Sequence, residues 1–165
     1  MTTEEALDGA PAQIAALFTP IPNGRVLAAL CALNGIKAQV LETSAGAIAV
    51  LDDATPVSLH GAAHSVSSFA KERPLVAMER RDGQITVWKY SAGQRGETLP
   101  PGLALNDAPG VVTTLMTGAQ TIADVAVTHE DKVFDAHMGK VAAFRELRKL
   151  STQAKREAKA QRDGR

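Results

Sequence analysis

The chain has 165 residues, 45% of them hydrophobic and only 4% aromatic, and its formal net charge is zero. This composition predicts one packed domain with a core of Ala, Val, Leu and Ile, and the zero charge excludes a general attraction of the whole chain to nucleic acid. The single cysteine, Cys31, cannot form an internal disulfide, which favours a reducing, cytoplasmic setting. The acidic N-terminus and the lack of a long uncharged apolar run argue against a secretion signal and a membrane span.

The first predicted elements are two helices separated by prolines. Ile14 and Phe18 follow helical spacing and predict a short helix over residues 3–18, which ends before the prolines. Asn23 is positioned to cap a second helix over residues 24–34, and a glycine ends that helix.

A β-hairpin and a third helix follow. Strands are predicted over residues 38–43 and 47–52, with Gly46 in the turn between them. A further short strand is predicted over residues 56–60. A weaker helix is predicted over residues 61–72, where a following proline prevents its extension.

The second hairpin carries the strongest local signal in the chain. Asp-Gly at residues 82–83 favours a two-residue type I′ turn, and this turn fixes the register of the flanking strands. Met78 then lies opposite Val87 on one side of the ribbon, and Ala77 lies opposite Trp88 on the other. We interpret the Met78 side as the face that packs under the helices.

The helix–hairpin pattern occurs twice. Residues 24–52 and 61–89 align with a constant shift of 37 positions. The matched residues are Gly46 and Gly83, Glu42 and Glu79, Ile48 and Ile85, and Val50 and Val87. The predicted fold class is α+β: two tandem helix–β-hairpin units form an antiparallel sheet with helices on one face, plus a C-terminal helical segment and a long basic helix. This element order is similar to that of small secretion-chaperone-like α+β domains.

The C-terminal part is predicted to be helical after a linker. Glycines and prolines mark residues 93–110 as linker-like, and Asp107 is positioned to cap a short helix that contains Leu115. Residues 121–128 fit either a helix or a strand. A long helix is predicted from about residue 130, because apolar side chains recur there every three or four residues.

These elements give a domain division. Residues 1–92 are predicted to form the α+β core, followed by the linker of residues 93–110. Residues 111–150 are predicted to form a helical segment that packs on the core. Residues 151–165 contain no Val, Ile, Leu, Met or aromatic residue, so they are predicted to form a basic solvated tail.

No motif in the chain indicates a reaction. Phosphate-binding loops, the dinucleotide-binding glycine pattern, the nucleophile elbow and the common zinc motifs are all missing. His60 and His64 are at helical spacing, but two imidazoles are too few to bind a metal. Since the motifs are also missing, no catalytic residue, cofactor or metal ligand is predicted, and an enzyme is the less favoured class. The enzyme alternative is a site assembled from five scattered groups: Glu42, Glu79, His60, His64 and Arg80. In this alternative the two matched glutamates lie close together, as paired carboxylates do in acid–base catalysis.

The leading functional hypothesis is a noncatalytic protein-binding or chaperone-like adaptor module that acts as a homodimer. Trp88 and Tyr90 are the only Trp and Tyr in the chain, and they are predicted on the sheet face that looks away from the helices. Leu75 and Lys89 would lie near the edge of this contact. In the alternative interpretation, the C-terminal helices cover the aromatic face and form a second core layer.

A second functional hypothesis concerns the basic C-terminus. Residues 129–165 carry ten basic and six acidic side chains. Weak, sequence-independent nucleic-acid binding through phosphate contacts would fall steeply with salt and would need residues 151–165. The candidate contact residues are Arg148, Lys149, Lys155, Arg156, Lys159 and Arg162. A membrane contact is not predicted, since the tail lacks an apolar face.

Overall fold

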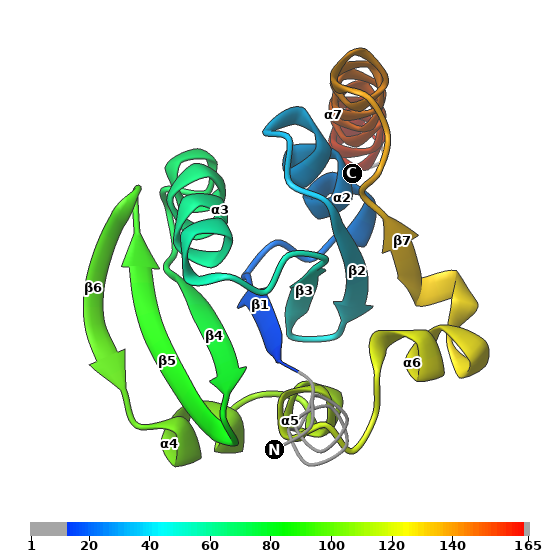
Figure 1. Cartoon of the computed structure of the whole chain (residues 1–165). Coiled ribbons are helices and arrows are strands. Elements are labelled where there is room, and N and C mark those ends of the chain that lie inside the picture. The colour runs from blue at the N-terminus through cyan, green and yellow to red at the C-terminus, as the bar shows by residue number, and fades with distance from the viewer. Residues whose placement is uncertain (1–12, 164–165) are drawn as a thin grey trace.

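The computed structural model describes residues 13–163, which form one sheet with helices on both of its faces (Figure 1). The strands are β1 (Ile14–Phe18), β2 (Ala38–Thr43), β3 (Gly46–Leu51), β4 (Leu75–Arg81), β5 (Gln84–Ser91), β6 (Gln94–Leu99) and β7 (Val133–Asp135). The helices are α2 (Gly24–Leu33), α3 (Pro56–Phe69), α4 (Pro101–Asn106), α5 (Gly110–Thr117), α6 (Ile122–Thr128), the short 3₁₀ helix η1 (Glu130–Lys132) and α7 (Lys140–Asp163).

All strand pairs are antiparallel, in the order β6-β5-β4-β1-β3-β2-β7, which confirms the α+β fold class. The two predicted hairpins share this sheet, but β1 lies between them. The helix predicted over residues 3–18 was therefore wrong for residues 14–18, which form β1. Residues 3–12 of that prediction lie outside the described residues. The run from Ile14 to Phe18 is apolar throughout because β1 is covered on both faces, and such a short run fits a helix or a buried strand equally well.

The register of the second hairpin is confirmed at every pair. Met78 lies opposite Val87, Ala77 opposite Trp88, and the strands close around the two-residue turn at 82–83. The first hairpin closes one residue earlier than predicted, since Thr43 pairs with Gly46 and leaves residues 44–45 in the loop.

The assignment of the two sheet faces was wrong. Met78 and Val87 are buried as predicted, but they belong to the core under the C-terminal helices, where α5 contacts β4 and α4 contacts β5. Helices α2 and α3 cover the opposite face, which contains Leu75, Ala77 and Tyr90. The error arose because both faces of the second hairpin carry large apolar side chains, so alternation alone does not tell which layer of helices covers which face.

The predicted helix over 24–34 is confirmed as α2, and the Asn23 side chain caps it by accepting hydrogen bonds from the N–H groups of Arg25 and Val26. The predicted strand over 56–60 was wrong. Thr55 caps α3, and Pro56 occupies its first turn. The N–H group that proline lacks would have no hydrogen-bond partner within the helix at this position.

Two C-terminal segments also differ from expectation. Strand β6 and helix α4 lie within the segment 93–110 that was predicted as a linker, and Asp107 ends α4 instead of capping the next helix. The long helix begins at Lys140, ten residues later than predicted. Residues 130–135 form η1 and the edge strand β7, which pairs with β2.

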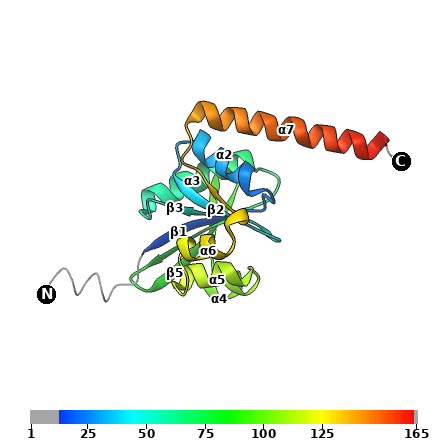
Figure 2. The same ribbon diagram turned by 90° about the vertical axis from the view of Figure 1, so that its right-hand side faces the viewer.

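Helix α7 begins on α2 and then extends beyond the rest of the protein (Figure 2). Ala143 is fully buried, while every residue from Ser151 to Arg162 is exposed. None of the helices within residues 13–163 is both long and apolar enough to cross a membrane.

Candidate functional site

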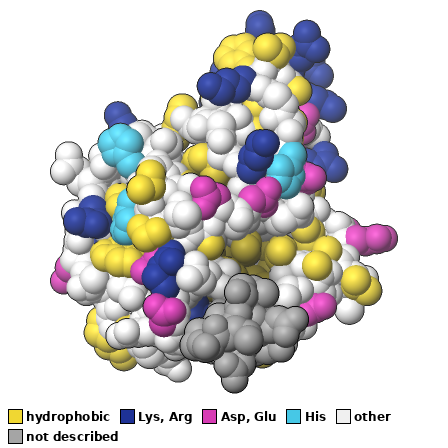
Figure 3. Space-filling model, in the orientation of Figure 1, with side chains coloured by type: hydrophobic (Ala, Val, Ile, Leu, Met, Phe, Trp, Pro, Cys, Tyr) yellow, Lys and Arg dark blue, Asp and Glu magenta, His cyan; other side chains and the backbone are white. Residues whose placement is uncertain are grey.

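The outer side of α7 carries a dense group of basic side chains. Its basic side chains are all exposed, and they gather on the projecting part of the molecule (Figure 3). They are Arg145, Arg148, Lys149, Lys155, Arg156, Lys159 and Arg162. Within residues 13–163 none of these cations forms an ion pair, so their charges are not compensated inside the chain. We refer to this surface as the outer face of α7.

Helical geometry explains why these cations share one side. Ala143, Leu147 and Leu150 are the residues that α7 turns toward the body, and they recur at spacings of four and three. At about 100° per residue, the seven basic residues fall on the opposite side. Several of them line one shallow groove along the helix: Arg145, Arg148, Lys149 and Arg156, together with Thr152 and Gln153.

The cations of the outer face form two rows. Arg148, Lys155 and Arg162 recur every seventh residue and make the first row. Arg145, Lys149 and Arg156 make the second row, about 100° around the helix from the first. Lys159 and Thr152 lie between the rows.

Charge is strongly segregated in this molecule. Helix α7 carries eight basic and three acidic residues, whereas residues 13–139 carry nine basic and twelve acidic ones. An acidic body with a basic projecting helix orients any polyanion toward the outer face and away from the sheet.

The residues predicted as protein-interaction anchors lie mostly inside the fold. Leu75 and Tyr90 are only 2% and 4% exposed, and both belong to the core under α3. Trp88 is half-buried against the same core, and Lys89 is half-buried. The proposed aromatic surface is therefore covered by α3, and the sequence-based reason for placing a partner there is lost.

A polar contact explains part of this burial. The Nδ1 atom of His60, on α3, lies 2.7 Å from the Tyr90 hydroxyl oxygen. The His60 ring also packs edge-on against the Trp88 ring, with 4.6 Å between the ring centroids. Burial, helped by the positive charge of Arg95, lowers the pKa of His60. A neutral His60 can hydrogen-bond the buried hydroxyl without placing a charge in the core, so this cluster serves packing.

Of the scattered groups of the enzyme alternative, His60 and Glu79 come close enough to interact electrostatically, and the others are kept apart. Glu42 lies on β2 and Glu79 on β4, and β3 and β1 run between them, which separates the two strands by about 14 Å. Arg80 points to the opposite sheet face, where it is 6% exposed and donates to the Met116 carbonyl at 2.9 Å. His64 contacts the Gly93 carbonyl instead of sharing a partner with His60.

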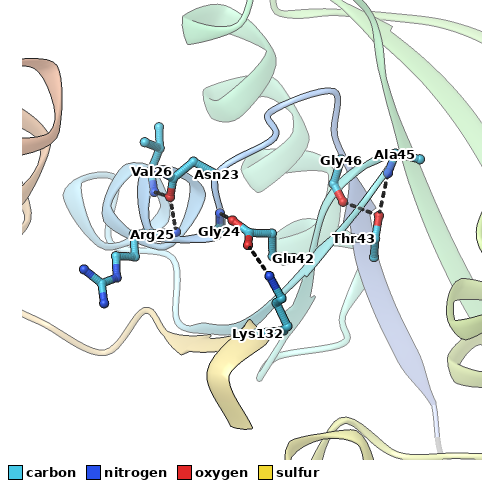
Figure 4. Close-up of polar contacts among 9 residues, drawn as sticks. All are labelled: Asn23, Gly24, Arg25, Val26, Glu42, Thr43, Ala45, Gly46 and Lys132. Carbon is cyan, nitrogen blue, oxygen red and sulfur yellow. Dashed lines mark hydrogen bonds and ion pairs between the residues drawn. The ribbon is translucent and has the colours of Figure 1, made fainter. Parts of the chain in front are cut away.

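Glu42 has a structural role at the start of α2 (Figure 4). Its Oε1 accepts a hydrogen bond from the Gly24 N–H at 2.8 Å, and its Oε2 pairs with Lys132 at 3.4 Å. The carboxylate thus occupies the positive end of the helix and ties α2 to β2. A Cβ at Gly24 would lie 2.5 Å from the ring of Phe134, so a larger residue here would force that ring to shift.

A second charged cluster fixes the start of α7. The His137 ring contacts the carboxylates of Asp52 and Asp135, which raises the pKa of His137, Asp52 making the largest contribution. The His137 N–H also donates to Asp135 at 2.7 Å. These contacts tie the segment before α7 to the end of β3. No group of three or more acidic, His or Cys side chains suited to a metal ion occurs within residues 13–163.

Cys31 is fully buried in α2. Burial raises the pKa of its thiol to about 12, so almost no thiolate exists at pH 8. We expect no labelling of Cys31 by a thiol-reactive dye at pH 8 in the folded protein, and complete labelling in denaturant. Rapid labelling without denaturant would contradict the buried position.

No family model, curated protein or solved structure matches this chain. The candidate site therefore depends on the geometry of α7. The predicted contact residues all lie on its outer face, and Arg145 was missed from that set. The sequence contains the pattern that would have included it, because Arg145 lies three and four residues before Arg148 and Lys149, and residues at these spacings share one side of a helix.

Proposed function

We propose that this protein is a noncatalytic binding module that holds nucleic acid through the outer face of α7. The observation that carries the proposal is the set of seven exposed cations on one side of a projecting helix, none with an ion pair in the described chain. A phosphate backbone offers regularly spaced negative charges, and each neutralised phosphate releases counterions, which favours binding.

This proposal ranks above the protein-binding and homodimer hypothesis for a physical reason. Trp88 and Tyr90 were the anchors of that hypothesis, and the contacts with α3 now account for both of them. The outer face of α7 is charged throughout and has no aromatic side chain, whereas the centre of a stable protein interface is typically depleted of charged residues and rich in aromatic ones.

The test is a matched pair of charge variants. One variant neutralises four cations of the outer face: R148Q, K149Q, R156Q and K159Q. Its control neutralises four exposed cations of the body: K37Q, K71Q, R73Q and R95Q. Both lose the same net charge, and glutamine keeps the helix propensity of α7 high.

Binding is measured by fluorescence anisotropy with labelled single-stranded and double-stranded oligonucleotides. We expect the outer-face variant to bind more than about tenfold more weakly than the intact protein, and the control variant to bind within about threefold of it. No binding by the intact protein, or an equal loss in both variants, would overturn the proposal.

A further inference from the structure

The nucleic acid that suits the outer face of α7 can be specified further, on the basis of the function proposed above. The first row (Arg148, Lys155, Arg162) and the second row (Arg145, Lys149, Arg156) diverge by about 100° around the helix axis. Cations placed on two sides of a helix reach two separate lines of phosphates, whereas a single strand offers one.

The length and width of α7 match a duplex groove. From Arg145 to Arg162 the helix is about 26 Å long, at 1.5 Å per residue, which corresponds to about seven or eight base pairs. An α-helix is about 10–12 Å wide and fits the major groove of B-form DNA, which is about 12 Å wide. The deep and narrow major groove of A-form RNA does not admit a helix.

The second half of α7 is also accessible on its outer face. All residues from Ser151 to Arg162 are exposed, and the helix extends past the body (Figure 2). On the inner side, Gln153, Ala154 and Glu157 still line a hollow with Asn23 and Arg25. Between Arg145 and Arg162, the only uncharged residue that lies between the two rows is Thr152, so no bulky apolar side chain projects there.

Stacking chemistry points away from single strands. Proteins that bind single strands usually stack bases on aromatic side chains. Within α7 the only aromatic residue is Phe144, and it precedes both rows. The outer face therefore offers charge without a base-stacking platform.

We infer that the outer face of α7 lies in the major groove of B-form DNA and contacts the phosphates of both strands, with little dependence on base sequence. Only Thr152 and Lys159 lie between the rows, where side chains would face the base edges. Binding that relies on phosphates fixes the position of the helix without reading the sequence.

The first measurement compares duplex DNA, single-stranded DNA and duplex RNA of one mixed sequence. We expect the intact protein to bind duplex DNA at least about tenfold more tightly than either other ligand. Equal affinity for all three would overturn this inference while leaving the proposed function in place. Failure to bind any of them would overturn both.

The second measurement tests the two rows separately. The first-row variant is R148Q/K155Q/R162Q, and the second-row variant is R145Q/K149Q/R156Q. We expect each to weaken duplex binding by a similar factor of about tenfold or more. A loss confined to one row would mean that α7 lies along a single strand, which would overturn the groove assignment.

Chemical protection gives an independent result. Dimethyl sulfate methylates guanine N7 in the major groove and adenine N3 in the minor groove. We expect the bound protein to protect guanine N7 and to leave adenine N3 reactive. Protection of adenine N3 alone would contradict the major-groove position.

Discussion

Raising the NaCl concentration from about 50 mM to about 200 mM should weaken DNA binding by this protein about a thousandfold. The expectation follows from counterion release, in which the logarithm of affinity falls with the logarithm of salt at a slope of about −0.9 per phosphate contact. Two rows of three cations provide six contacts. Anisotropy titrations at several salt concentrations measure this slope directly.

The row variants serve as controls for that slope. Removing one row should reduce the slope by about half, because three of six phosphate contacts are lost. The control variant in the body should keep the slope of the intact protein. A slope close to zero in the intact protein would show that binding does not depend on phosphates, contrary to our proposal.

Replacing Gly46 by alanine should destabilise the fold by roughly 3–5 kcal/mol. Gly46 has a φ of +138°, which side chains rarely allow, and a Cβ would lie 2.1 Å from the Thr19 carbonyl oxygen. That carbonyl cannot easily move away, because the Thr19 N–H and hydroxyl both donate to the Ala47 carbonyl, at 2.9 and 2.8 Å. Urea unfolding measures the loss in the free energy of unfolding.

The matched control is Gly83→Ala, the glycine at the corresponding position of the second hairpin. Gly83 also has a positive φ, of +77°, but no atom lies within 4 Å of its added Cβ. Backbone strain alone should cost about 1–2 kcal/mol. If G46A lost no more stability than G83A, the close approach between Gly46 and Thr19 would be disproved.

Local signals predicted the parts of this fold that depend on neighbours in sequence. The Asp-Gly turn determined the register of the second hairpin, and Asn23 marked the start of α2, because both effects act over a few residues. The position of β1 could not be predicted this way. Its five residues gain their structure from two strands that lie far away in sequence.

The candidate site shows the same division. Charge and helical spacing, which are local properties, predicted six of the seven outer-face cations. The expected proximity of Glu42 and Glu79 failed because it depended on how the hairpins meet, and β1 separates them. The expected exposure of Tyr90 failed for a related reason, since it depended on which helices cover which face.

The central place of β1 has a consequence for how the protein folds. Ala16 pairs with Val50 on one side and with Met78 on the other, so β1 closes loops of very different lengths. Each hairpin can form from adjacent residues within microseconds, but the joining of the two must await the arrival of a distant segment. We therefore expect the joining of the two hairpins through β1 to limit the rate of refolding. On the ribosome, β1 can pair with β3 before β4 has been synthesised, so the other edge of β1 stays unpaired until β4 emerges.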